Sequence, residues 1–253
     1  MVILLCSRVL KAMDVWIRLN STTAGKDKLI RLMQYLSRFL CHNLESKKNL
    51  RDHVARLKIL ESSFSTFRKF LRLDKSIIIL HGALRTLHLP DRILRVTLTL
   101  SRIYQTFFLL VDHIIWIGRI GLYDIDKEKW SKYSNKFWLG YIILNLFRDI
   151  YEILRIIQRQ VRCQNPVPCL YKNVPFIRTV CDYVPVTKPV FQFAEEHKDV
   201  FWDSLKNICD IWIPLTSLGH TKLSPGMVGL LGSVSSFAGL VAVLDPLAKL
   251  APT

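Results

Sequence analysis

Two segments in the N-terminal third of the chain carry apolar residues at the spacing of an amphipathic α-helix. They run from about Lys26 to Leu44 and from about Leu57 to Arg72, and their apolar positions recur at i, i+3, i+4 and i+7. The polar stretch from Glu45 to Asp52 separates them. The pattern predicts two amphipathic helices. The apolar side of the first comprises Leu29, Leu32, Met33, Leu36, Phe39 and Leu40.

The second of these helices has the composition of a helix that lies in the headgroup plane of a bilayer. Its apolar side, predicted to insert into the membrane, comprises Leu57, Leu60, Phe64, Phe67, Phe70 and Leu71. Its polar side carries four cations predicted to contact lipid headgroups, each worth about 1 kcal/mol at an anionic surface: Lys58, Arg68, Lys69 and Arg72. A helix of a bundle would bury the same apolar side against its neighbours, so the sequence leaves both alternatives open.

The central part of the chain is apolar but interrupted by ionisable residues. Helix is expected to resume after Pro90, from Ile93 to Gly121, and this stretch contains Arg102, Asp112 and His113. Ionisable groups at bilayer depth cost several kcal/mol unless they face protein or water. The segment is therefore intramembrane or interfacial, and these three side chains are candidates to line a polar path. The apolar run 137–147 that follows is too short to span a bilayer as a lone helix.

The run from Met227 to Leu244 contains no charged residue. Ser224, Pro225 and Gly226 precede it, and Asp245 ends it. Eighteen residues at about 1.5 Å each give roughly 27 Å, close to the hydrocarbon thickness of a bilayer. We therefore predict a transmembrane helix, in preference to a buried core helix. Small residues at helical spacings predict close helix packing: Gly229, Gly232, Ser235, Ser236 and Gly239.

The distribution of charge along the chain helps to identify the class of binding partner. The 253 residues include 36 Lys and Arg against 20 Asp and Glu, for a net charge of +16, and half of them are hydrophobic. Such a surplus suits nucleic acid or an anionic membrane surface. However, sixteen of the cations and only six of the acids lie at or before Lys75. A basic N-terminal third joined to an apolar C-terminal run favours a membrane, and no aromatic and basic recognition motif for nucleic acid is found.

The chain carries no recognisable catalytic chemistry. It contains no Gly-rich phosphate loop, no dinucleotide fingerprint, no H-E-x-x-H and no G-x-S-x-G. The six cysteines form no C-x-x-C pair, and we interpret His197 with its acidic neighbours as a solvated helix start. The sequence therefore predicts no enzyme and no catalytic, cofactor-binding or metal residues.

These patterns together predict an all-α membrane protein with N-terminal amphipathic helices, hydrophobic central helices and a C-terminal transmembrane helix. Its expected divisions are an N-terminal extension (1–12), a cytosolic amphipathic helical region (13–89), a membrane-embedded or interfacial helical region (90–161), a Pro-rich variable loop (162–190), and a C-terminal helix with its transmembrane anchor (191–253). Met13 is a natural second start for the chain.

Several of these segments resemble the peroxin eleven family of peroxisomal membrane proteins, in its alpha/beta-like branch. The similar segments occur in the family's order and at similar spacing: Met13–Arg18, Phe67–Leu73, Asp112–Gly118, Asn145–Ile153, Asn207–Leu215 and Ser224–Leu230. The resemblance covers about Met13 to Leu250. The extension at 1–12 and the loop at 162–190 have no counterpart in it.

The resemblance implies a protein of the peroxisomal membrane with both termini in the cytosol. Family members insert an amphipathic helix, self-associate and elongate the organelle before fission and proliferation. The implied partners are anionic membrane lipids, the peroxin nineteen chaperone, tail-anchored fission adaptors and a dynamin-related GTPase. A channel for small metabolites, with Arg102, Asp112 and His113 along a polar path, is the alternative function.

Overall fold

A computed structural model describes residues 13–45, 47, 50–164, 190–245, 248 and 250, and in this part of the chain all regular structure is helical. The predicted all-α fold is confirmed. The N-terminal extension 1–12 and residues 165–189 of the Pro-rich loop lie outside the described residues. Residues 13–21 are helical, and the elements after them are α2 (Thr23–Glu45), α3 (Arg51–Leu71), α4 (Lys75–Thr86), α5 (Arg92–Arg119), α6 (Lys127–Gln164), α8 (Val190–Glu196), α9 (Lys198–Ser217) and α10 (Pro225–Leu244).

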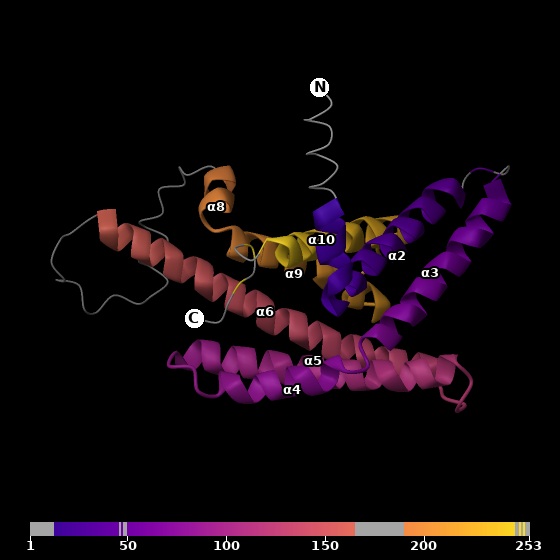
Figure 1. The fold of residues 1–253 in the computed structure, drawn as a ribbon, viewed down its shortest axis with the longest axis horizontal. Helices are drawn as coiled ribbons and strands as arrows, with labels where there is room; N and C mark the ends of the chain where they lie inside the picture. The colour runs from indigo at the N-terminus through magenta and orange to yellow at the C-terminus, as the bar shows by residue number, and fades with distance from the viewer. Residues whose placement is uncertain are drawn as a thin grey trace, which may run out of the picture.

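The described helices pack with their neighbours along the chain, and three pairs that are not consecutive also pack together: α2 with α10, α3 with α5, and α6 with α9. Helices α2 and α3 form one antiparallel hairpin, and α4 lies along α5, which in turn packs against α6 (Figure 1). Helix α10 packs against both α9 and the distant α2. Asp91 begins α5 as its N-cap, because its carboxylate accepts from the amides of Ile93 and Leu94. Pro90 therefore precedes a helix start, as the sequence predicts.

The small residues of α10 lie against α2 of the same chain. A Cβ atom at Gly229 would come within 2.7 Å of the backbone nitrogen of Phe39, and Gly232 lies against the ring of Tyr35. Ser235, Ser236 and Gly239 are buried as well. Close approach of two helices is what this spacing of small residues permits. In this structure, α2 occupies that surface.

The described helices place polar side chains inside the bundle and large apolar side chains outside. On α2, Arg31, Gln34 and Ser37 are buried, whereas Met33 and Leu40 are exposed. The same inversion occurs on α5, where four polar residues are buried beside exposed aliphatic and aromatic ones: Thr97, Ser101, Thr106 and Asp112. A water-soluble bundle has the opposite arrangement. An apolar exterior around a polar interior suits a bundle that contacts hydrocarbon.

Helix α10 is the one described helix that is both long and apolar enough to cross a membrane. Its N-cap is Ser224, whose hydroxyl accepts from the amide of Met227, and Pro225 occupies the first turn, where its missing N–H costs no hydrogen bond. The helix ends at Leu244, immediately before Asp245. These bounds match the uncharged run in the sequence.

Replacing Gly229 with alanine tests the close approach of α10 to α2. Alanine favours a helix over glycine by about 1 kcal/mol, so propensity alone would stabilise the variant. Because the added methyl meets the backbone of Phe39, which cannot rotate away, we expect Gly229→Ala instead to destabilise the protein by about 1–3 kcal/mol. Thermal unfolding in detergent, followed by tryptophan fluorescence, measures the shift. Val234→Ala, on the exposed side of α10, is the control, and a Tm unchanged by Gly229→Ala would contradict the contact.

Candidate functional site

Helix α3 presents its apolar side outward. Phe67 and Phe70 are 49% and 51% exposed, Leu60 is exposed too, and Leu57, Phe64 and Leu71 are partly exposed. Val54 is the one residue of α3 that is buried. The bundle therefore does not cover the predicted membrane-inserting side, and the alternative of a buried apolar side is wrong for this structure. Insertion of these six residues into a membrane stays a prediction.

The exposed rings of α3 continue onto α5. The ring centroids of Phe67 and Phe70 are 6.5 Å apart, and the ring of Phe70 lies 5.8 Å from that of Trp116 on α5. Aromatic side chains carry the largest apolar area per residue, so this row is the part of α3 that gains most from leaving water. Its position on the outer surface makes it available to a bilayer without any unfolding.

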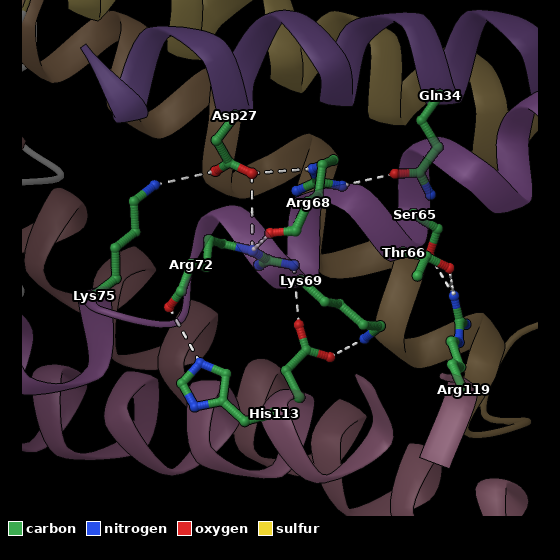
Figure 2. A network of polar contacts seen from close by, with 11 residues as sticks. Asp27, Gln34, Ser65, Thr66, Arg68, Lys69, Arg72, Lys75, His113 and Arg119 are labelled. Carbon is green, nitrogen blue, oxygen red and sulfur yellow. Dashed lines mark hydrogen bonds and ion pairs between the residues drawn. The ribbon is translucent and has the colours of Figure 1, made fainter. Parts of the chain in front are cut away.

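The basic side of α3 points into the bundle, where Asp27 of α2 receives three cations (Figure 2). The Arg68 Nε lies 3.2 Å from Asp27 Oδ1, the Arg72 Nε lies 3.7 Å from the same oxygen, and the Lys75 Nζ lies 3.4 Å from Oδ2. Arg68 also donates to the Gln34 side-chain oxygen over 2.8 Å. Asp27 thus joins the basic side of α3 to α2.

A second carboxylate, Asp112 on α5, holds the same side of α3. It pairs with Lys69, and its Oδ2 lies 2.9 Å from the Arg72 Nη2. The neighbouring His113 contacts the Arg72 carbonyl through its Nε2 at 3.1 Å. Arg72 therefore lies between Asp27 and Asp112, and it links α2, α3 and α5.

These ion pairs are buried, and burial determines the free-energy cost of removing one partner. The side chains of Asp27, Arg68, Lys69, Arg72 and Asp112 are each only 4–13% exposed. Removing one member of a buried pair costs about 3–5 kcal/mol, because it leaves the partner charge buried and uncompensated. At the far end of the helix, Lys58 and Glu45 form an exposed pair at 3.0 Å, and this hydrogen bond lowers the pKa of Glu45. The buried pairs hold α3 far more strongly than the exposed one.

The structure separates the four predicted headgroup cations into two groups. Lys58 is exposed, whereas Arg68, Lys69 and Arg72 are held by buried carboxylates. Headgroup contact by the latter three stays a prediction, and it requires α3 to leave Asp27 and Asp112. Sequence reasoning missed Asp27. Its signal was an isolated acid between Lys26 and Lys28, on the polar side of an amphipathic helix.

The residues of the predicted polar path are brought to different partners. Arg102 donates to the carbonyl of Gly82 on α4, and Asp112 pairs with α3. Two cavities adjoin inside the bundle: Asp112 lines the larger one and Arg102 the smaller, whereas His113 lines neither. No group of three or more metal-ligating side chains is found in the described residues.

Comparison with known proteins extends over nearly the whole chain. Residues 13–244 match the family model described as "Peroxisomal biogenesis factor 11 (PEX11)". The chain is 34% identical to Peroxisomal membrane protein 11A of Homo sapiens over 251 residues, which cover 94% of this chain and 99% of that protein. It is 30% identical to Peroxisomal membrane protein 11B of Homo sapiens over 259 residues, covering 95% and 100% respectively. A homolog from Dictyostelium discoideum is 24% identical over 88% of this chain and 91% of its own. No solved structure matches.

Substitution of Asp112 by asparagine tests how α3 is held. The change leaves Lys69 and Arg72 with one carboxylate fewer in a buried site, so we expect α3 to open more readily. A loss of about 3 kcal/mol corresponds to roughly 100-fold faster amide exchange over Arg51–Leu71. Hydrogen–deuterium exchange of the full chain, measured by mass spectrometry, provides the readout. Glu45→Gln, which removes only the exposed pair with Lys58, should leave this exchange unchanged. Equal exchange in Asp112→Asn and the unchanged chain would show that the buried pairs do not hold α3.

Proposed function

We propose that this chain, which belongs to the peroxisomal biogenesis factor 11 family, shapes the peroxisomal membrane by inserting the apolar side of α3 into its cytosolic leaflet. The observation that carries the proposal is the outward exposure of Phe67 and Phe70 on a helix whose opposite side is basic and held by carboxylates. The family's printed description is that of a biogenesis factor, and the proposal contains no catalytic step.

The physical basis is the area that α3 adds to one leaflet. Its inserted apolar side acts there as a wedge. Apolar side chains that enter between headgroups expand the cytosolic leaflet relative to the other, which favours outward curvature. Helix α10 is the anchor that keeps α3 at this membrane, because it is long and apolar enough to cross it. Both termini face the cytosol in this proposal, which requires a second crossing of the membrane besides α10, and the region 90–161, expected to be membrane-embedded or interfacial, is the candidate for it. Curvature of this kind favours elongation, fission and proliferation of the organelle.

Further partners belong to the same proposal. Self-association of the chain concentrates the wedges, and anionic lipids receive the cations of α3 once it leaves Asp27 and Asp112. The apolar run of α10 and its basic approach from Lys206 suit the peroxin nineteen chaperone, which delivers such segments to the membrane. Tail-anchored fission adaptors and a dynamin-related GTPase then divide the elongated membrane.

Tubulation of liposomes by the full-length protein tests the wedge. We expect the double variant Phe67→Ser and Phe70→Ser to lose most tubulation at equal membrane-bound protein, because it removes the two exposed rings of α3. The control is Ile77→Ser with Ile78→Ser on α4, which removes two apolar side chains outside α3 that are even more exposed than the two phenylalanines. Electron microscopy counts tubules. An equal loss in both double variants would assign the effect to apolar surface in general and reject a specific role of α3.

A channel for small metabolites is the second candidate function, and two adjoining cavities that carry charged residues favour it. Their volumes are about 730 Å³ and 600 Å³, inside a bundle with an apolar exterior. A polar lumen within an apolar shell is the arrangement that conduction requires.

Planar bilayer recording of the purified protein tests conduction. We expect Arg102→Gln to change the single-channel conductance, because Arg102 lines the smaller cavity, whereas Arg92→Gln, at the exposed start of α5, should not. Absence of any current from purified protein would reject the channel.

A further inference from the structure

The two cavities in the bundle are adjacent, and the space around their junction is lined by four residues that they share. Lys28, Gln105, Tyr141 and Lys206 line both. These residues come from α2, α5, α6 and α9, so the space lies at the centre of the bundle and not on one outer face. A volume of about 730 Å³ for the larger cavity lies within the range of small-molecule sites, which hold ligands of nucleotide size.

The lining of this space carries a strong excess of positive charge. Ten Lys and Arg residues line the larger cavity against four Asp and Glu, and four line the smaller against two. Carboxylates already compensate many of the cations, including those that hold α3. The remaining cations converge on two half-open cavities, where they attract an anion.

Lys28 lines both cavities and, unlike Lys206, has no carboxylate of its own. Its side chain lies across Gly239 of α10, where a Cβ atom would come within 3.0 Å of the ammonium nitrogen. No hydrogen bond or ion pair of this ammonium is found in the described residues. Its charged neighbours are two cations, Arg31 and Lys206, and two carboxylates, Asp27 and Asp210, which pair with other cations. A buried ammonium beside two like charges is costly unless an anion joins it.

The two neighbouring cations differ from Lys28 because each has its own carboxylate. Arg31 pairs with Asp210, and Lys206 pairs with Asp203. Arg31 is further fixed by the aromatic rings of Tyr35 and Trp138, whose centroids lie 5.5 Å and 5.9 Å from its guanidinium carbon. Lys28 therefore has no carboxylate of its own, beside two neighbouring cations that do.

We propose that this space is a binding site for a small anion that bears several phosphate groups, with Lys28 as its central cation. Guanidinium and ammonium groups together are the donors that proteins use for phosphate oxygens. Tyr141 and Gln105 add neutral hydrogen-bonding groups at the junction of the two cavities. The site is separate from the membrane-inserting side of α3, and it holds its ligand whether or not the cavities conduct.

Binding of two probes to the full-length protein in phosphatidylcholine nanodiscs tests this site. The first probe is free inorganic pyrophosphate, measured by calorimetry at constant ionic strength. The second is a phosphoinositide with a phosphorylated headgroup, added to the nanodisc lipid and measured by cross-linking to the chain. Binding of pyrophosphate identifies a free metabolite as the source of the phosphate, and binding of the lipid alone identifies a headgroup.

Three variants decide whether the binding occurs at Lys28. Lys28→Gln is expected to weaken the affinity for the bound probe at least tenfold, and Lys28→Arg to restore most of it. Because Lys28 loses no protein partner, the glutamine variant should keep the helical content and Tm of the unchanged chain. Lys129→Gln removes the same charge from an exposed position of α6 that lines neither cavity, and it should bind normally. Failure of both probes to bind, or equal weakening by Lys28→Gln and Lys129→Gln, would overturn the proposal.

Discussion

Arg72 lies between two buried carboxylates, Asp27 of α2 and Asp112 of α5, and the arrangement of the N-terminal half depends on this contact. Arg68 and Lys69 reinforce it from the adjacent positions of α3. Because the charges are buried, they are screened little by salt, and loss of any one leaves the others uncompensated. The basic side of α3 must therefore face the bundle, and its phenylalanines must face outward. The orientation of α3 follows from the ion pairs and not from apolar burial.

The same inversion of polar and apolar residues extends through the bundle. Arg31 and Asp210 join α2 to α9, and Arg148, Asp149 and Asp203 join α6 to α9. Interior contacts of this kind lie beside a hydrophobic core that includes Leu94, Ile115 and Ile142. An interior built from charged side chains also encloses polar space. The membrane surface of the protein and its cationic cavities thus have one physical origin.

Helix α10 contributes to the packing of the bundle in a different way, because its small residues allow other parts of the chain to approach closely. Gly229 and Gly232 let α2 approach so closely that Phe39 and Tyr35 lie over the helix axis. Gly239 makes room for the stem of Lys28 by the same means. One row of small residues therefore joins the two ends of the chain and also places the unpaired cation at the centre of the bundle. The transmembrane anchor and the polar interior are linked through this row.

The sequence by itself determined the helical fold, the start of a helix after Pro90 and the apolar run of α10, because periodicity, Pro90 and the absence of charge from 227 to 244 act locally. It also placed phenylalanines and cations on opposite sides of α3. It revealed neither α4 nor the extent of α6 from Lys127 to Gln164. Only the tertiary structure decided that Arg68, Lys69 and Arg72 meet Asp27 and Asp112, which are far away in the chain. The reason is physical: a helical pattern shows which residues share a side, but the partner of a buried charge depends on which helices pack together.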